Sequence, residues 1–401
     1  MDLSKAVDRA FTQSLPKIEA STYPMQTPFN RIERLSSTRK ETESRLFTNL
    51  HAHLSGSISR QCLHEIWLKK KAQDPDFNIE DPWITMPPGK SFNKSIYNLV
   101  NDLASLTYAT HSVLTDFQND GVTYLELRTI PRASPSSSFT REEYLTTVLD
   151  AISDFQANQS PTSPKMSVYL ILALDRGHHT TAEALEIVDL ALAHRARGIV
   201  GIDVCGNPTK GDVSVLREAF AKAKANELGV TVHFPEMREA ATPGELETLL
   251  EFQPDRLGHV IHVPEELKRE IARRQLGLEL CMSCNVHAKM FDGGFLDHHF
   301  GYWRHQNCPI VLCVSLCYYH FSSSPSFSYT NRQLILVQTD DVGFFCSPVS
   351  NEYLLAAEHF QLTRTDVLGI CRKSYDAIFG GEKEKDRLRR LLSDFEAHYS
   401  T

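Results

Sequence analysis

Short apolar segments alternate with longer amphipathic ones along most of the chain. Many of the short segments are rich in Val, Ile and Leu, a composition typical of buried β-strands. We expect strands at 46–50, 122–127, 168–174, 199–204, 230–233, 256–259 and 278–281. The apolar spacing predicts helices between them, at 57–71, 141–156, 181–193, 213–228, 243–251 and 264–274, and a long amphipathic stretch at 94–119.

This alternation indicates a parallel sheet with helical crossover connections. About eight such units favour an α/β fold of the closed TIM-type (β/α)8 barrel class, with extra helices. A doubly wound sheet is the alternative, but no G-x-G-x-x-G follows the first strand. Since barrels with insertions reach this length as one domain, we expect residues 1–401 to form a single domain.

Polar residues gather where the predicted strands end. In a barrel these ends converge on one mouth, where the chemistry takes place. An active site is therefore predicted from the residues at these ends, namely His51, His53, Arg132, Asp175, Gly206, His233, His259 and, after the last apolar segment, Asp340 and Asp341.

The His-x-His pair in Leu50-His51-Ala52-His53-Leu54 is the centre of this set. Side chains at i and i+2 of a strand share a face, so the two imidazoles can aim at one point. An isolated pair of this kind is more often a pair of surface histidines. Here His233 and Asp340 extend it to three imidazoles and one carboxylate, which suits a zinc ion with an open position for water.

Three further residues can serve a reaction at such a zinc ion, which turns bound water into a nucleophile near neutral pH. Glu236 follows His233 by three residues and can protonate a ring nitrogen as the nucleophile attacks. His259 can orient or deprotonate the water, and Asp341 can hold the other edge of a substrate.

Composition limits the partners. The net charge is −8, the pI is about 6.1 and no long basic run occurs, so we expect no nucleic acid and no membrane as partner. The N-terminus lacks the apolar core of a signal peptide, and nine cysteines fit reduced intracellular thiols. We expect a cytoplasmic monomer.

Seven motifs carry a family resemblance: "LHAHLSGS", "LELRTIPR", "GIDVCGNP", "HFPE", "DRLGH", "LELCMSCN" and "TDD". Their order resembles the adenosine deaminase family. "LELRTIPR", Cys284-Asn285-Val286 and "DHHFGYW" are similar to its adenosine deaminase-like branch, the N6-methyl-AMP deaminases. The resemblance extends from Leu50 to the C-terminus.

The resemblance implies one zinc per chain on His51, His53, His233 and Asp340, with Glu236 as proton donor, His259 as the water-orienting residue and Asp341 as a substrate contact. It implies further contacts to a small purine nucleotide from His53, Ser55, Thr129, Ile130, Pro131, Arg132, Asp175 and Gly206. Arg132 would suit a phosphate. The chain departs from the family pattern at Ser55, Asn207, Pro235 and Val260; at the last position the family has Gly.

The implied reaction converts N6-methyl-AMP and water to IMP and methylamine. Adenosine or AMP deamination is an alternative. Another metal-dependent amidohydrolase is a second alternative, but it usually needs a lysine at the end of the fourth strand. A third is an inactive product, disabled by the two insertions described next.

Two stretches interrupt the family pattern, at 20–49 and at 314–338. Joining Glu19 to Leu50 would give "SLPKIELHAHLSGS", and joining Cys313 to Thr339 would give "CPIVLCTDDVGFF". Val314-Ser315, Thr330-Asn331 and Gln338 can be encoded by the donor, branch-point and acceptor sequences of an intron. We therefore suspect that both stretches are non-native insertions.

These stretches create two choices of strand. Continuity with Asp340 favours 334–337 over 309–313 as the last strand, and the same logic favours 46–50 over 16–19 as the first.

Two side-chain pairs receive no catalytic role. Cys281 and Cys284 are expected in the core, and His298-His299 is expected to be a polar surface or loop pair.

Overall fold

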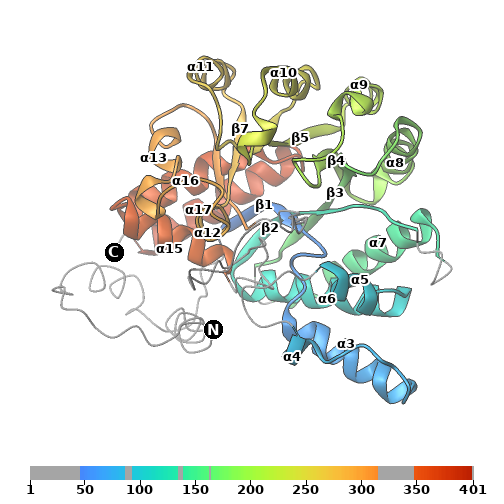
Figure 1. Cartoon of the computed structure of the whole chain (residues 1–401). Coiled ribbons are helices and arrows are strands. Elements are labelled where there is room, and N and C mark those ends of the chain that lie inside the picture. Colours follow the sequence, from blue (N-terminus) through green and yellow to red (C-terminus); the bar gives the residue numbers. More distant parts are fainter. Residues whose placement is uncertain (1–45, 86–92, 134–138, 162–163, 315–346, 400–401) are drawn as a thin grey trace, which may run out of the picture.

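The structure is a computed structural model, which describes residues 46–85, 93–133, 139–161, 164–314 and 347–399. Its described part contains one sheet of eight strands at the centre of the molecule (Figure 1). The strands are β1 (Phe47–His53), β2 (Val122–Thr129), β3 (Ser167–Asp175), β4 (Ile199–Cys205), β5 (Gly229–Phe234), β6 (Arg256–His259), β7 (Gly277–Leu280) and β8 (Ile310–Leu312).

All neighbouring strands in the order β1 to β8 pair in parallel. β8 also lies against β1, and the thiol of Cys313 contacts the backbone of Leu50. The sheet thus curls into a nearly closed barrel with helices between the strands. The predicted TIM-type (β/α)8 fold is confirmed, and so is the first strand.

Helices surround the strands (Figure 1). They are α3 (Arg60–Gln73), α4 (Pro82–Thr85), α5 (Asn93–Leu99), α6 (Leu103–Asn119), α7 (Arg141–Ala157), α8 (Thr181–Ala193), α9 (Arg217–Ala225), α10 (Pro243–Glu251), α11 (Glu265–Arg274), α12 (Met282–His287), α13 (Phe300–Trp303), α15 (Val349–His359), α16 (Arg364–Ser374) and α17 (Glu382–Tyr399). Short 3-10 turns are η1 (Arg195–Arg197), η2 (Val213–Leu216), η3 (Arg238–Ala240), η4 (Phe295–Asp297) and η5 (Tyr375–Ala377).

Local sequence explains several helix starts. The hydroxyl of Thr180 accepts from the backbone N–H of Glu183, and the carboxylate of Glu183 accepts from the backbone N–H of Thr180, which satisfies two donors at the start of α8 at once. The amphipathic stretch at 94–119 forms two separate helices, α5 and α6. Asp102 caps α6 and accepts from the backbone of Ser105, so the chain restarts a helix there.

The last strand is also not the expected one. β8 is Ile310–Leu312, which pairs with β7, whereas 334–337 lie outside the described residues. The chain returns from α13 to the sheet through a short loop, and Ile310, Val311 and Leu312 are buried there. Burial of these side chains within the sheet outweighs continuity with Asp340.

In the described part of the chain, no helix has the length and apolarity needed to cross a bilayer.

Candidate metal centre and active site

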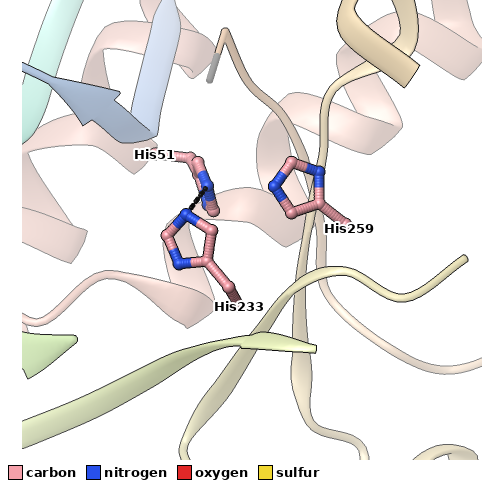
Figure 2. Close-up of side chains that lie close together, drawn as sticks. All are labelled: His51, His233 and His259. Carbon is pink, nitrogen blue, oxygen red and sulfur yellow. Dashed lines mark hydrogen bonds between the residues drawn. The ribbon is translucent and has the colours of Figure 1, made fainter. Parts of the chain in front are cut away.

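Three imidazoles converge at the mouth of the barrel. His51 and His53 come from β1, and His233 comes from β5. Nε2 of His233 lies 3.1 Å from Nε2 of His51 and 3.2 Å from Nε2 of His53. Figure 2 shows His51 and His233 facing each other, with His259 beside them. The rings of His51, His53 and His233 are all buried.

The opposite ring nitrogens of two of these histidines face carboxylates. Nδ1 of His51 donates to Glu279, and Nδ1 of His233 lies 3.2 Å from Oδ1 of Asp203. Burial alone would raise the pKa of Glu279, but Arg128 and Arg256 hold this pKa below its ordinary value. An ionised carboxylate can only accept, so each Nδ1 carries a hydrogen, and in the neutral ring the Nε2 of each histidine presents a lone pair.

Two lone pairs that face each other repel unless a cation lies between them. Metal–nitrogen bonds of about 2.0–2.1 Å in a tetrahedral site place neighbouring ligand nitrogens about 3.4 Å apart. The observed 3.1 and 3.2 Å are close to this spacing. Burial lowers the pKa of His51 and of His53 well below the ordinary value, which keeps both rings in the neutral, metal-binding form. The donor set therefore fits a metal ion.

A buried ionic network lies under the histidines, inside the barrel. Arg128 donates to Oδ2 of Asp203 at 3.0 Å and to Oε2 of Glu279 at 2.8 Å. Arg256 lies 2.7 Å from Oε1 of Glu279 and 2.6 Å from Glu126. Arg128 therefore links the two carboxylates that hold His51 and His233. Charges this deeply buried need such pairing, because desolvation is costly.

Glu236 and His259 lie beside the imidazole cluster. Glu236 follows β5, His259 ends β6, and Oε2 of Glu236 lies 3.4 Å from Nε2 of His259. Gly206, Arg176, His233 and Glu236 help to line a cavity of about 10 Å³, which gives room for one water molecule.

The backbone at the end of β6 is strained. His259 and Val260 have φ values of 62° and 50°, in the left-handed region that disfavours β-branched residues. A left-handed backbone at Val260 agrees with the Gly that the sequence resemblance leads us to expect there. Strain of this kind persists where the surroundings impose it, often at functional sites. Nε2 of His299 donates to the carbonyl of His259 at 2.6 Å and holds this turn.

The remaining predicted contacts lie at the strand ends or directly after them. Thr129 ends β2 and bonds the hydroxyl of Tyr144 at 2.7 Å. Asp175 ends β3 and packs so closely on Gly206 that a Cβ at this glycine would lie 2.6 Å from the carboxylate. Ser55 and Ile130 are half-buried, and Pro131 is buried.

The side chain of Arg132 contacts α5 and the residue that follows this helix. Its guanidinium donates to the carbonyl of Val100 and lies 4.8 Å from the ring centroid of Tyr97. Asp340 and Asp341 lie outside the described residues, so the fourth predicted ligand and one predicted substrate contact stay predictions.

Four residues that support the cluster received no role from the sequence: Asp203, Glu279, Asn285 and His298. Asp203 and Glu279 are charged residues inside apolar strands, and this is a signal that could have found them. His298 lies in the loop before α13, which is one of the two places expected for it, but it is not on the surface, because its side chain is buried and its Nε2 lies 3.0 Å from Oδ1 of Asn285. Cys281 and Cys284 are buried in the core, as predicted.

The barrel and its histidine cluster define the class of metal-dependent hydrolases that work at the mouth of a (β/α)8 barrel. The family model of adenosine deaminase matches residues 47–294. The chain belongs to the adenosine deaminase family.

Several relatives of this chain are named for one particular deaminase activity. The N6-mAMP deaminase of Arabidopsis thaliana is 30% identical over 86% of this chain and 95% of its own length. The human N6-methyl-AMP deaminase is 28% identical over 85% and 90%. A crystal structure of the Arabidopsis N6-mAMP deaminase superposes with a TM-score of 0.75 at 29% identity, covering 88% of this chain and 98% of that one. Arabidopsis ADAL complexed with IMP gives a TM-score of 0.75 at 28% identity, covering 89% and 98%.

Proposed function

We propose that this chain is a zinc-dependent deaminase that converts N6-methyl-AMP and water to IMP and methylamine. The observation that carries the proposal is the convergence of His51, His53 and His233 beside Glu236 at the barrel mouth. Relatives that cover most of the chain are named for this activity, and a similar structure holds IMP.

The three histidines would hold the zinc, with Asp340 as the fourth ligand. A bound zinc ion supplies a nucleophile by lowering the pKa of coordinated water to about 7. Glu236 would transfer a proton to N1 of the purine as the carbon–oxygen bond forms at C6. As the C6–N6 bond breaks, the hydroxyl proton at C6 would pass to N6, so that methylamine leaves and the C6=O bond of IMP forms. His259, 3.4 Å from Glu236, would orient the oxygen.

A nucleotide, rather than a nucleoside, is proposed because two arginines lie near the strand ends. Arg176 follows β3 and lines the same cavity as Glu236. Arg132 follows β2 and can present a planar, permanently charged group to a phosphate. Asp341, Ser55, Thr129, Ile130, Pro131, Asp175 and Gly206 are the other proposed contacts. We also propose a cytoplasmic monomer, which size-exclusion chromatography and fractionation would test.

The test is an assay of purified, zinc-loaded protein with N6-methyl-AMP, AMP and adenosine in parallel. We expect N6-methyl-AMP to give the highest kcat/KM and IMP as product. His233→Ala should lose both zinc and turnover, whereas His305→Ala, at an exposed histidine, should keep both. Full zinc content together with full activity in His233→Ala would contradict the ligand assignment. Preference for adenosine would contradict the nucleotide assignment.

A further inference from the structure

Behind His259 lies a buried chain of hydrogen bonds that the proposed chemistry does not use. It runs from α13 through His298 and Asn285 to the ring of His259. His298 is 2% exposed and Asn285 is fully buried. Because no water enters such a chain, each donor in it must meet an acceptor.

The first link has a fixed direction. The backbone N–H of Phe300, at the start of α13, lies 3.0 Å from Nδ1 of His298. A backbone N–H always donates, so Nδ1 of His298 accepts and carries no hydrogen. The hydrogen of this ring is therefore on Nε2.

The second link follows from the first. Nε2 of His298 lies 3.0 Å from the side-chain oxygen of Asn285, and this oxygen accepts. The amide nitrogen of Asn285 then points the other way. It lies 3.2 Å from the sulfur of Met290 and 3.3 Å from that of Cys284, which are weak acceptors suited to an N–H group. The thioether of Met290 can only accept, so this contact independently supports the same orientation of the amide.

The third link reaches the active site. The amide nitrogen of Asn285 lies 3.1 Å from Nδ1 of His259. Since an amide NH₂ group only donates, Nδ1 of His259 must accept. The hydrogen of the His259 ring is then on Nε2, the nitrogen that faces Glu236 at 3.4 Å.

We propose that His298 and Asn285 are positioning residues that lock His259 in the tautomer with hydrogen on Nε2. In this tautomer His259 donates a hydrogen bond at the reaction centre and has no lone pair there with which to take a proton from water. Of the two roles considered for His259, orienting the nucleophile is therefore the one it performs. This role rests on the proposed deamination, but the tautomer itself does not.

The direct test is the ring-nitrogen NMR spectrum of the zinc-loaded chain labelled with ¹⁵N-histidine. His259→Gln identifies the signals of His259 by their disappearance. We expect an unprotonated Nδ1 and a protonated Nε2 in the wild type. The opposite pattern would overturn the proposal, whether or not the protein deaminates N6-methyl-AMP.

Asn285→Asp is the variant that should switch the tautomer of His259. A carboxylate only accepts, so it should draw the hydrogen of His259 to Nδ1. We expect this switch in the spectrum and a fall in kcat of about tenfold or more, with zinc content unchanged and KM changed less than about twofold. His305→Ala, at an exposed histidine away from this chain of hydrogen bonds, is the control, and the tautomer of His259 should stay as in the wild type. An unswitched His259 in folded Asn285→Asp would overturn the proposal.

Discussion

Nδ1 of His51 donates a hydrogen bond to Glu279, and both side chains are fully buried. The same carboxylate accepts from Arg256 at 2.7 Å and from Thr231 at 2.9 Å. These partners fix the carboxylate, and the carboxylate fixes both the rotation and the tautomer of the imidazole. A carboxylate behind a metal-binding histidine also makes that histidine more basic.

Replacing this carboxylate should weaken metal binding without touching a ligand. Glu279→Gln removes the charge that orients His51, and the loss of such a partner typically costs 10- to 100-fold in metal affinity. We expect a zinc affinity lower by about this factor, measured by chelator competition on the folded protein. Glu266→Gln, at an exposed glutamate of α11, is the control and should bind zinc normally. Equal affinities in the two variants would contradict the role of Glu279.

Glu236→Gln should separate metal binding from chemistry. Gln cannot transfer a proton, and general acid–base catalysis contributes about 10²- to 10⁴-fold. We expect stoichiometric zinc in this variant, with kcat for N6-methyl-AMP reduced by about that factor. The measurement is steady-state kinetics beside metal analysis. A loss smaller than about tenfold, well under this range, would exclude Glu236 as the acid.

Glu352 should make stability depend on pH. This carboxyl group of α15 is fully buried, and burial raises its pKa above the ordinary value of 4.5. Above pH 4.5 the unfolded chain loses this proton while the folded chain keeps it. The unfolded state then binds fewer protons, so stability falls as the pH rises toward the pKa of the folded state.

The difference between wild type and Glu352→Gln reports this effect in urea unfolding at pH 5 to 8. The wild type should lose up to about 1.4 kcal/mol per pH unit relative to the variant within this window. Glu358→Gln, at an exposed glutamate of the same helix, should give a difference from wild type that does not change with pH. A pH-independent difference for Glu352→Gln would show that its pKa is unshifted.

Much of the barrel was predictable because its strands are short, buried and β-branched. Strand β6 and helices α8 and α10 have the predicted boundaries. His51, His53, His233, Glu236 and His259 come together because strand ends in a barrel share one mouth. Periodicity and strand position are local signals, so one sequence is enough for these predictions.

The partners of these residues depend on contacts that no local pattern contains. Asn285 meets His259 only because α12 packs behind the end of β6, and His298 meets Asn285 only through the loop before α13. The choice of the last strand failed for a related reason. Sequence continuity places residues near one another along the chain, whereas burial decides which segment joins a sheet.

The suspected insertion at 20–49 leads to a testable prediction about β1. The suspected stretch 20–49 includes the first three residues of this strand, and the pairing of β1 with β2 is irregular on both sides of Thr48–Asn49. Asn49 is buried, and its amide nitrogen has no hydrogen-bond partner among the described residues. Such a group costs about 1–3 kcal/mol. We expect a chain without 20–49 to be more stable than the full chain, as measured by its melting temperature. A lower melting temperature would mean that 20–49 is native to the fold.

Removing 314–338 should improve the metal site. β8 ends at Leu312, and the family-like residue Cys313 contacts β1, so the barrel is complete before the suspected insertion begins. In the shortened chain, Thr339 would follow Cys313 directly, which would bring Asp340 next to the end of a rigid strand. His53 and His259 have the same kind of position at the ends of β1 and β6. Because a preorganised ligand binds with less loss of entropy, we expect zinc affinity to rise by about tenfold or more, with faster deamination. Asp340→Ala in the shortened chain is the matched control and should cancel the gain. Weaker zinc binding after the deletion, or mature transcripts that all retain both stretches, would show that 314–338 is part of the native protein.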